Sequence, residues 1–430
     1  MKQSLISIII FFAALTISNA QEESKFGVKF SGFVKSDIIW DSRQGVSARE
    51  GHFYLYPMNE NLDERGEDIN AKSNFNMLSI QTRLRALATG PDVWGAKSSA
   101  FVEGAFFGAV EGNINTFRLR HAFVKLAWTK TQLLVGQYWH PMFNVRCFPG
   151  TVSFNTGAPF QPFSRNPQVR LTQSFGKFNF TLTALAQRDF TSTGPFGGST
   201  VYLRNTGYPA FNGRLEYFDK NDDNGNEFLA GFSFNYKALT PRIVTTEGYK
   251  TSETAMSGAF SGYLKYKSKD FTIQFNGFYG GDAYNLTMLG GYAVSDTSNI
   301  SGKLEEYECI RNFSLWTDMQ TNGDQFQFGL FAGYSQNLGS SEDIAGDIAN
   351  RSDYVYTRGA DIDYLYRISP RVIYNSGKFR IAPEIEYTVA AYATKVKPGE
   401  KPLNIDSKGK VTDSKTVGNI RFLLAVYFFF

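Results

Sequence analysis

The sequence of 430 residues lacks, beyond its first 20 residues, any apolar run long enough to form a transmembrane helix. Its mean hydropathy is −0.27, which is typical of a polar protein. Only helices and closed barrels satisfy every backbone polar group in lipid. If the mature chain lies in a membrane at all, it must therefore be a β-barrel.

The sequence also lacks a strong charge imbalance and any internal boundary. Lys and Arg number 44, Asp and Glu number 40, and the net charge of +4 is too small to indicate a nucleic-acid partner. We find no linker, charge run or composition shift that would divide the chain into soluble domains. Residues 21–430 are therefore predicted to form a single domain.

Residue patterns for catalysis or metal binding are missing as well. The three histidines, His52, His121 and His140, do not stand in zinc-binding spacing, and no G-x-S-x-G nucleophile motif occurs. The stretch 219–225 resembles a calcium loop, but its glycine is displaced by one position and no glutamate closes it. We expect a polar turn there, and we predict no enzyme activity, catalytic residue, metal site or cofactor.

Cysteine is scarce, with only Cys147 and Cys309. They could form one disulfide in an oxidising compartment, or they could remain two unpaired thiols. The sequence leaves both alternatives open.

The N-terminus has the features of a secretory signal. Lys2 is followed by an apolar run over residues 5–17 and by the small-x-small sequence Ser18-Asn19-Ala20. We predict that residues 1–20 are cleaved on export, and no cysteine follows the apolar run to carry a lipoprotein anchor.

The last eleven residues, 420–430, alternate with period two and end on Phe430. One face of this segment is entirely apolar, which in a soluble protein would leave an aggregation-prone edge. In a closed outer-membrane barrel the same face meets lipid, and this ending resembles that of outer-membrane β-barrel proteins. We expect the segment to pair with residues 26–40, and we expect the barrel-assembly machinery to recognise it.

Strand-like segments recur along the whole chain, separated alternately by short and long connections. The fold class predicted is all-β, a transmembrane antiparallel barrel of about 16 strands with short periplasmic turns and long extracellular loops. The expected strands are 26–40, 78–86, 96–107, 117–126, 132–139, 168–175, 178–187, 210–217, 228–236, 258–266, 271–279, 309–318, 326–334, 362–374, 379–389 and 420–430. Fourteen or eighteen strands remain alternatives, and a break of alternation near His121 predicts a β-bulge.

The segment FRLRHAFVKL at residues 117–126, followed by LLVGQYW at 133–139, resembles the arginine-rich hairpin and the V-G-Q-x-W segment of the DcaP-like trimeric porins. This resemblance implies a Gram-negative outer-membrane location, a homotrimer and passive uptake of small organic anions through an arginine-lined pore.

Charged side chains on the strand faces opposite the apolar registers are expected to line a water-filled lumen, because a charge facing mid-membrane lipid costs roughly 2–4 kcal/mol. They are Arg83, Arg85, Glu103, Arg118, Arg120, Arg170, Arg214, Arg367, Arg371, Arg380 and Arg421. Arginine stays protonated and grips carboxylates, so anion selectivity follows if the arginines outnumber their counter-charges. The alternative is that they pair with acidic residues and only fill a polar wall.

Residues 142–166 contain three prolines and several phenylalanines, and we expect them to fold into the lumen as a constriction loop. Arg146 and Arg165 would then lie near the narrowest point. The predicted function is an outer-membrane porin for small, mainly anionic solutes such as organic acids. A barrel with a plugged lumen, acting in surface binding, adhesion or structure, remains the alternative.

Overall fold

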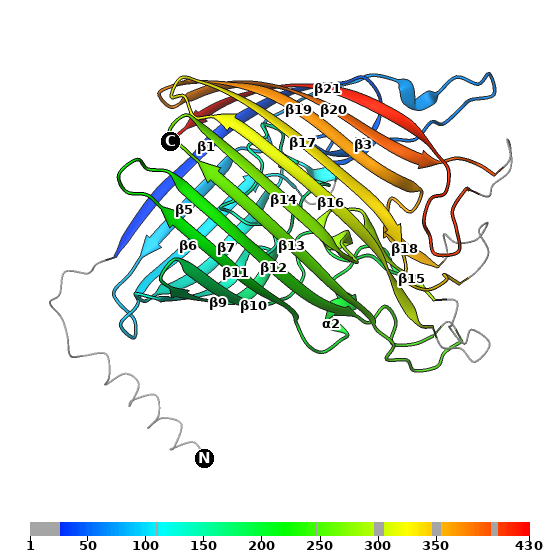
Figure 1. The fold of residues 1–430 in the computed structure, drawn as a ribbon, viewed down its shortest axis with the longest axis horizontal. Coiled ribbons are helices and arrows are strands. Elements are labelled where there is room, and N and C mark those ends of the chain that lie inside the picture. The colour runs from blue at the N-terminus through cyan, green and yellow to red at the C-terminus, as the bar shows by residue number, and fades with distance from the viewer. Residues whose placement is uncertain (1–25, 109–110, 246, 296–304, 346–353, 397–402) are drawn as a thin grey trace, which may run out of the picture.

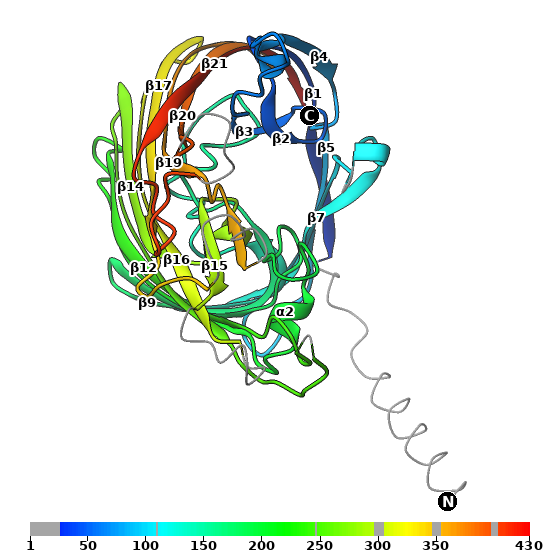
Figure 2. The same ribbon diagram turned by 90° about the vertical axis from the view of Figure 1, so that its right-hand side faces the viewer.

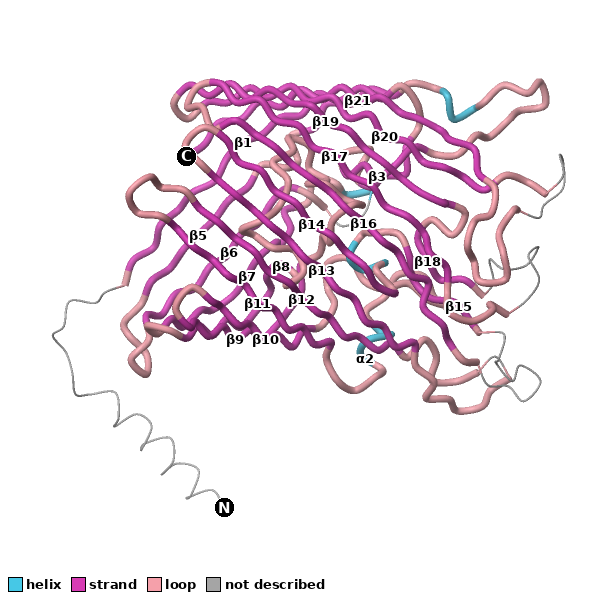
Figure 3. Tube along the Cα trace, in the orientation of Figure 1, coloured by secondary structure: helices cyan, strands magenta, loops and turns pink. Residues whose placement is uncertain are grey.

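The computed structural model describes residues 26–108, 111–245, 247–295, 305–345, 354–396 and 403–430. Strands dominate the trace, and its helical turns are few and short (Figure 3). Within the described ranges we find no helix with the length and apolar character of a membrane span. The predicted signal, residues 1–20, lies outside the described residues.

Sixteen strand positions close into one antiparallel ring, which confirms the predicted fold class. In ring order they are β1 (Gly27–Asp41), β4 (Asn74–Leu78) together with β5 (Arg83–Thr89), β6 (Lys97–Phe106), β7 (Phe117–Ala127), β8 (Thr131–Trp139), β9 (Arg165–Phe175), β10 (Phe178–Leu185), β11 (Ala210–Lys220), β12 (Glu227–Leu239), β13 (Ala255–Lys267), β14 (Phe271–Gly281), β16 (Tyr307–Thr321), β17 (Phe326–Gly339), β19 (Ile362–Ser376), β20 (Phe379–Ala393) and β21 (Ser414–Phe429).

Ring closure joins the first strand to the last, as predicted. Phe33 on β1 lies opposite Phe429 on β21, and Asp41 lies opposite Arg421. The start of β1 and the C-terminus lie at the same end of the barrel as the short turns, while the long connections gather at the other end (Figure 1). Closure leaves neither of these strands with a free edge in this register, so the backbone groups of the wall are paired.

The second strand position is divided in two. β4 pairs with the Asp37–Asp41 part of β1, and β5 pairs with the Gly27–Phe33 part, so both lie along the same edge of β1. Residues 79–82 interrupt the strand between them, and the Thr82 hydroxyl accepts a hydrogen bond from the Lys35 backbone N–H at 3.2 Å.

Side chains alternate between an exposed apolar outer face and a buried inner face. On β21, Phe422 and Phe428 are exposed, whereas Arg421, Leu423 and Ala425 are buried. The same alternation around the ring gives the outer face the apolar surface that lipid requires. The apolar register of the last strand therefore faces outward, as predicted.

The β-bulge expected near His121 is present. Glu103 on β6 lies opposite His121, but Gly104 lies opposite Leu119, so Arg120 is the additional residue on β7. Both Arg120 and His121 are consequently buried on the inner face.

Smaller elements fold outside the ring register. They are β2 (Gly45–Ala48), β3 (Phe53–Pro57), β15 (Gly290–Val294), β18 (Val355–Arg358), α2 (Val201–Arg204) and the 3-10 turns Ile69–Ala71, Glu111–Asn113 and Tyr284–Leu286. β2 pairs with β3 as a hairpin that lies within the ring when the barrel is viewed from the end of the long connections (Figure 2). The sequence predicted no strand between residues 40 and 78, so the hairpin was missed. The sequence signal for this hairpin was the run Phe-Tyr-Leu-Tyr-Pro at Phe53–Pro57, which is buried throughout.

Candidate functional site in the barrel lumen

The connection from β8 to β9, residues 140–164, is the inner loop. It folds into the lumen and follows the inner wall from β11 to β20. The Asn144 side-chain amide donates to Glu216 at 3.0 Å, and the Gly150 N–H donates to Asp318 at 3.0 Å. Farther around the ring, Glu384 on β20 accepts from the loop backbone. Carboxylates of the wall therefore hold the loop along much of its length.

Aromatic side chains of the inner loop supply its apolar contacts. Phe143 stacks on Trp139 with ring centroids 4.0 Å apart, and Phe160 is fully buried against β17. A Cβ atom at Gly333 on β17 would lie 2.6 Å from the Phe160 ring, so this position admits the ring only as glycine. The loop is thus packed as a small core inside the barrel.

Arg367 on β19 fastens the inner loop and the β2–β3 hairpin to the same place on the wall. It donates to the carbonyl of Ala158 at 2.9 Å and to the carbonyl of Leu55 at 2.7 Å. Its guanidinium also lies 3.5 Å from Glu386, and its Nε donates to Thr388 at 2.8 Å. Because Arg367 has no exposed surface, it acts as a structural clamp in this arrangement.

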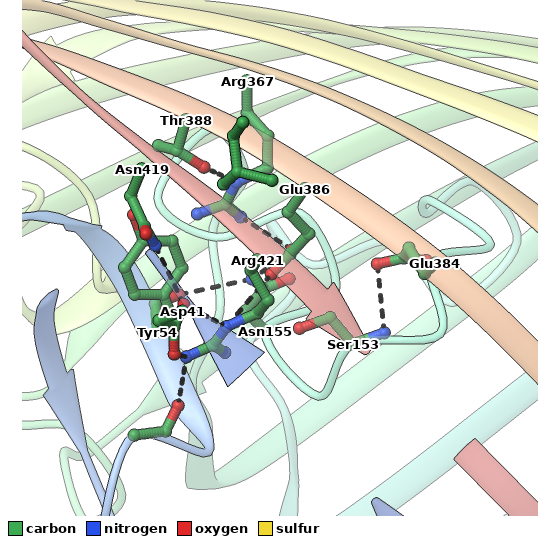
Figure 4. A network of polar contacts seen from close by, with 12 residues as sticks. Asp41, Tyr54, Ser153, Asn155, Arg367, Glu384, Glu386, Thr388, Asn419 and Arg421 are labelled. Carbon is green, nitrogen blue, oxygen red and sulfur yellow. Dashed lines mark hydrogen bonds and ion pairs between the residues drawn. The ribbon is translucent and has the colours of Figure 1, made fainter. Parts of the chain in front are cut away.

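Arg421 occupies the neighbouring part of this network (Figure 4). It makes a bidentate contact with Asp41 at 2.9 and 2.8 Å, across the closure between β21 and β1. Asn419 donates to the same carboxylate at 2.9 Å, and the Tyr54 ring lies 4.4 Å from the guanidinium. Arg371 is paired similarly with Asp318 at 2.7 Å.

Three of the predicted lumen arginines converge on Glu103, the acid that β6 contributes. Arg85 and Arg120 each donate to it at 2.6 Å, and Arg83 lies 4.0 Å from it. Of the three, Arg120 is almost fully buried, whereas Arg83 and Arg85 keep 17% and 34% exposure. One carboxylate is shared by three guanidinium groups, so positive charge remains in surplus here.

Arg118 has a different partner, Asp189, which sequence reasoning did not identify. Arg118 lies 3.2 Å from Asp189, and the Arg165 Nε donates to the same carboxylate at 2.7 Å. Burial of Asp189 opposes its ionisation, but Arg165 and Arg118 outweigh burial and lower the pKa of Asp189 to about 2. The available signal was an acid two residues beyond the end of the predicted strand 178–187.

The two arginines predicted for the constriction lie in different environments. The predicted constriction loop, residues 142–166, extends too far, because Arg165 is the first residue of β9. Arg165 is fully buried in its pair with Asp189. Arg146 does belong to the inner loop, is exposed, and lies 4.8 Å from the Phe218 ring.

The remaining predicted arginines also lie on inner strand faces. Arg214 lies 3.1 Å from Glu216, whereas Arg170 donates to Gln168 at 3.0 Å and to the Trp139 carbonyl at 2.7 Å. Arg380 donates to Asn375 at 2.8 Å.

Other reactive groups are occupied or dispersed. Both cysteines are free, and His52 is hydrogen-bonded to Asp37 at 2.8 Å. Across the part of the chain that the structure describes, no three His, Cys, Asp or Glu residues gather as a metal site.

No protein-family model matches the chain, and no curated protein matches it by sequence. Solved structures do match. The outer membrane channel DcaP of Acinetobacter baumannii aligns with a TM-score of 0.66 at 15% identity, over 96% of this chain and 100% of that one. OmpT of Vibrio cholerae aligns at 0.52 and 11% identity over 96% and 100%, and an anion-selective porin from Comamonas acidovorans at 0.52 and 11% over 94% and 100%. The chain therefore has the sixteen-stranded barrel fold of the Gram-negative outer-membrane porins.

Proposed function

We propose that the protein is an outer-membrane porin, a non-enzymatic channel for passive diffusion of small, mainly anionic solutes such as organic acids. The charge distribution in the lumen supports this function. The inner loop contains no aspartate or glutamate, and two of the wall acids that it contacts, Glu216 and Asp318, are paired with Arg214 and Arg371. Arginines are left to dominate the field that a solute meets.

The comparisons support the same proposal at the level of fold. One matched structure is described as an outer membrane channel and another as an anion-selective porin. We further propose that residues 1–20 direct export and are removed, that the C-terminal strand is recognised by the barrel-assembly machinery, and that the protein forms homotrimers in the bilayer. A trimer form is described for the matched OmpT of Vibrio cholerae.

Planar-bilayer recording tests the proposed function. Purified protein should give stepwise conductance, and its reversal potential in a potassium chloride gradient should show chloride preference at low salt. The preference should weaken as salt approaches molar strength, because the Debye length falls to about 3 Å. Preference for potassium would contradict anion selectivity while leaving the channel intact.

A second candidate function is a barrel with a closed lumen that binds a partner through its long outer connections. The amount of chain within the ring favours it, since every residue of β3 and most of the inner loop are buried. Absence of conductance from correctly folded protein would select this alternative.

A further inference from the structure

A cavity of about 230 Å³ lies in the lumen between the start of the inner loop and the strands β7, β8, β9, β10 and β11. Its lining includes Phe123, Lys125, Leu134, Arg146, Arg170 and Arg214. Lys125 stands near the end of β7, close to the short turn that leads to β8, so the cavity lies toward the periplasmic end of the barrel.

The cavity has more cations than acids. Glu216 is the acid in its lining, and it is engaged by Arg214 at 3.1 Å and by the Asn144 amide at 3.0 Å. Among the described residues, Lys125, Arg146 and Arg170 have no carboxylate within ion-pair distance. Arg170 instead donates to a neutral amide and to a backbone carbonyl, as described above.

The position of Arg146 is fixed although its side chain is exposed. Its backbone N–H donates to the Asn144 side chain at 2.8 Å, and its carbonyl accepts from Lys265 at 3.0 Å. A second cavity of about 330 Å³ also has Arg146 in its lining, and there Glu227 and Lys265 contribute one charge of each sign. Arg146 therefore borders two spaces that a solute could occupy.

This cationic cavity differs from the Glu103 cluster. At Glu103 three arginines share a carboxylate, and Arg120 is almost fully buried. A cation that is already paired and desolvated contributes less to binding a passing anion than one with no counter-charge. This cavity therefore holds cations without a counter-charge toward the periplasmic end, in a place that the arginine pattern on β5 and β7 does not indicate.

We propose that Lys125, Arg146 and Arg170 form an anion-binding subsite that determines selectivity, and that its preferred ligand is a small carboxylate with an apolar body. The inference rests on the proposed channel function. The cations would hold the carboxylate, and the side chains of Phe123, Leu134 and Val145 in the same lining would contact the apolar part. The volume suits such a solute, being below the roughly 300–1,000 Å³ of pockets for drug-sized ligands.

Benzoate and acetate form a matched pair of probes, because both carry one carboxylate and only benzoate carries a large apolar body. Their half-blocking concentrations would be measured from the chloride current of the purified protein in planar bilayers. We expect benzoate to block at a lower concentration than acetate. Inorganic phosphate, which has charge without an apolar part, should block less well than benzoate.

Charge-removing variants test the residues. Arg146→Gln and Lys125→Gln should each raise the half-blocking concentration of benzoate about fivefold, the effect of one partly exposed ion contact. Lys130→Gln is the matched control, because Lys130 is exposed in the turn between β7 and β8 and does not line the cavity. Arg170→Gln is a third test variant, provided that it assembles. Arg170 also donates a hydrogen bond to the Trp139 carbonyl, so its loss could disturb the fold as well as the subsite.

Three outcomes are decisive. Equal benzoate block in the wild type, Arg146→Gln and Lys125→Gln would overturn the subsite while leaving the channel proposal intact. Equal block by acetate and benzoate, or stronger block by phosphate, would overturn the preference for an apolar body. If the correctly folded wild-type protein gave no conductance, that result would instead contradict the proposed function itself.

Discussion

Arg371 on β19 reaches across β17 to pair with Asp318 on β16, with nitrogen to oxygen distances of 2.7 and 3.0 Å. Its path crosses Gly329 on β17, where a Cβ atom would lie 2.4 Å from the guanidinium carbon. Asp318 also accepts the N–H of Gly150 in the inner loop. The absence of a side chain at Gly329 thus allows a contact that holds the loop against the wall.

Replacing Gly329 with valine should displace Arg371 and release this part of the inner loop. Breaking a buried ion pair costs on the order of 3–5 kcal/mol, so the folded barrel should lose its heat-modifiable migration at a lower temperature. Single-channel current should also become larger or noisier. Gly262→Val on β13 is the control, because no atom lies within 4 Å of a Cβ there. Identical behaviour of the two variants would argue against the role of Gly329.

Glu103→Gln should increase chloride preference. The substitution removes the carboxylate shared by Arg83, Arg85 and Arg120 and leaves their positive charges without a counter-charge. The reversal potential in a potassium chloride gradient should shift further toward that of chloride, most clearly at low salt. A shift toward potassium would mean that these arginines do not face the ion pathway.

Removing the last three residues should impair assembly. The backbone of Phe430 exchanges hydrogen bonds with Gly32 at 3.0 and 3.2 Å, and its ring covers the place where a Gly32 side chain would stand. Without these contacts, the pairing of β21 with β1 loses its last hydrogen bonds at the end of the barrel where the short turns lie. Whole-cell fractionation and gel migration before and after heating measure the assembled fraction. Unchanged insertion and migration would contradict this view of the closing strand.

The native thiol of Cys147 should resist labelling in the folded protein. Burial raises the pKa of Cys147 to about 12, so at pH 8 the reactive thiolate fraction is on the order of 10⁻⁴. Labelling should therefore increase only toward strongly alkaline pH or after denaturation.

The labelling of Cys147 can be measured alone in a Cys309→Ser variant, because Cys309 is the other free cysteine. The reagent is a membrane-impermeant maleimide applied to whole cells. Ser341→Cys, at an exposed position between β17 and β18, is the control and should react at neutral pH. Equal labelling of Cys147 and Ser341→Cys at neutral pH would place the inner loop outside the barrel.

The strand pattern was determined by the sequence. Period-two alternation of apolar and polar residues is imposed by lipid on one side and a polar interior on the other, so it is visible locally in most strands. The strand predicted over 78–86 is wrong in its bounds, because residues 79–82 interrupt the wall between β4 and β5. The ring of sixteen positions, the outward face of β21 and the bulge beside His121 were therefore predictable from neighbouring residues alone.

Which charges meet in the lumen was decided only by the tertiary structure. Ring closure brings Asp41 to Arg421, and the inner loop brings Ser153 to Glu384, 231 residues away in sequence. Local alternation gives the face of a charged side chain but carries no information about its height in the barrel or about which loop lies opposite. The pairing of Arg118 with Asp189, the attachment of the β2–β3 hairpin to Arg367 and the cationic cavity at Arg146 depend on such long-range contacts, because each joins segments that are distant in the sequence.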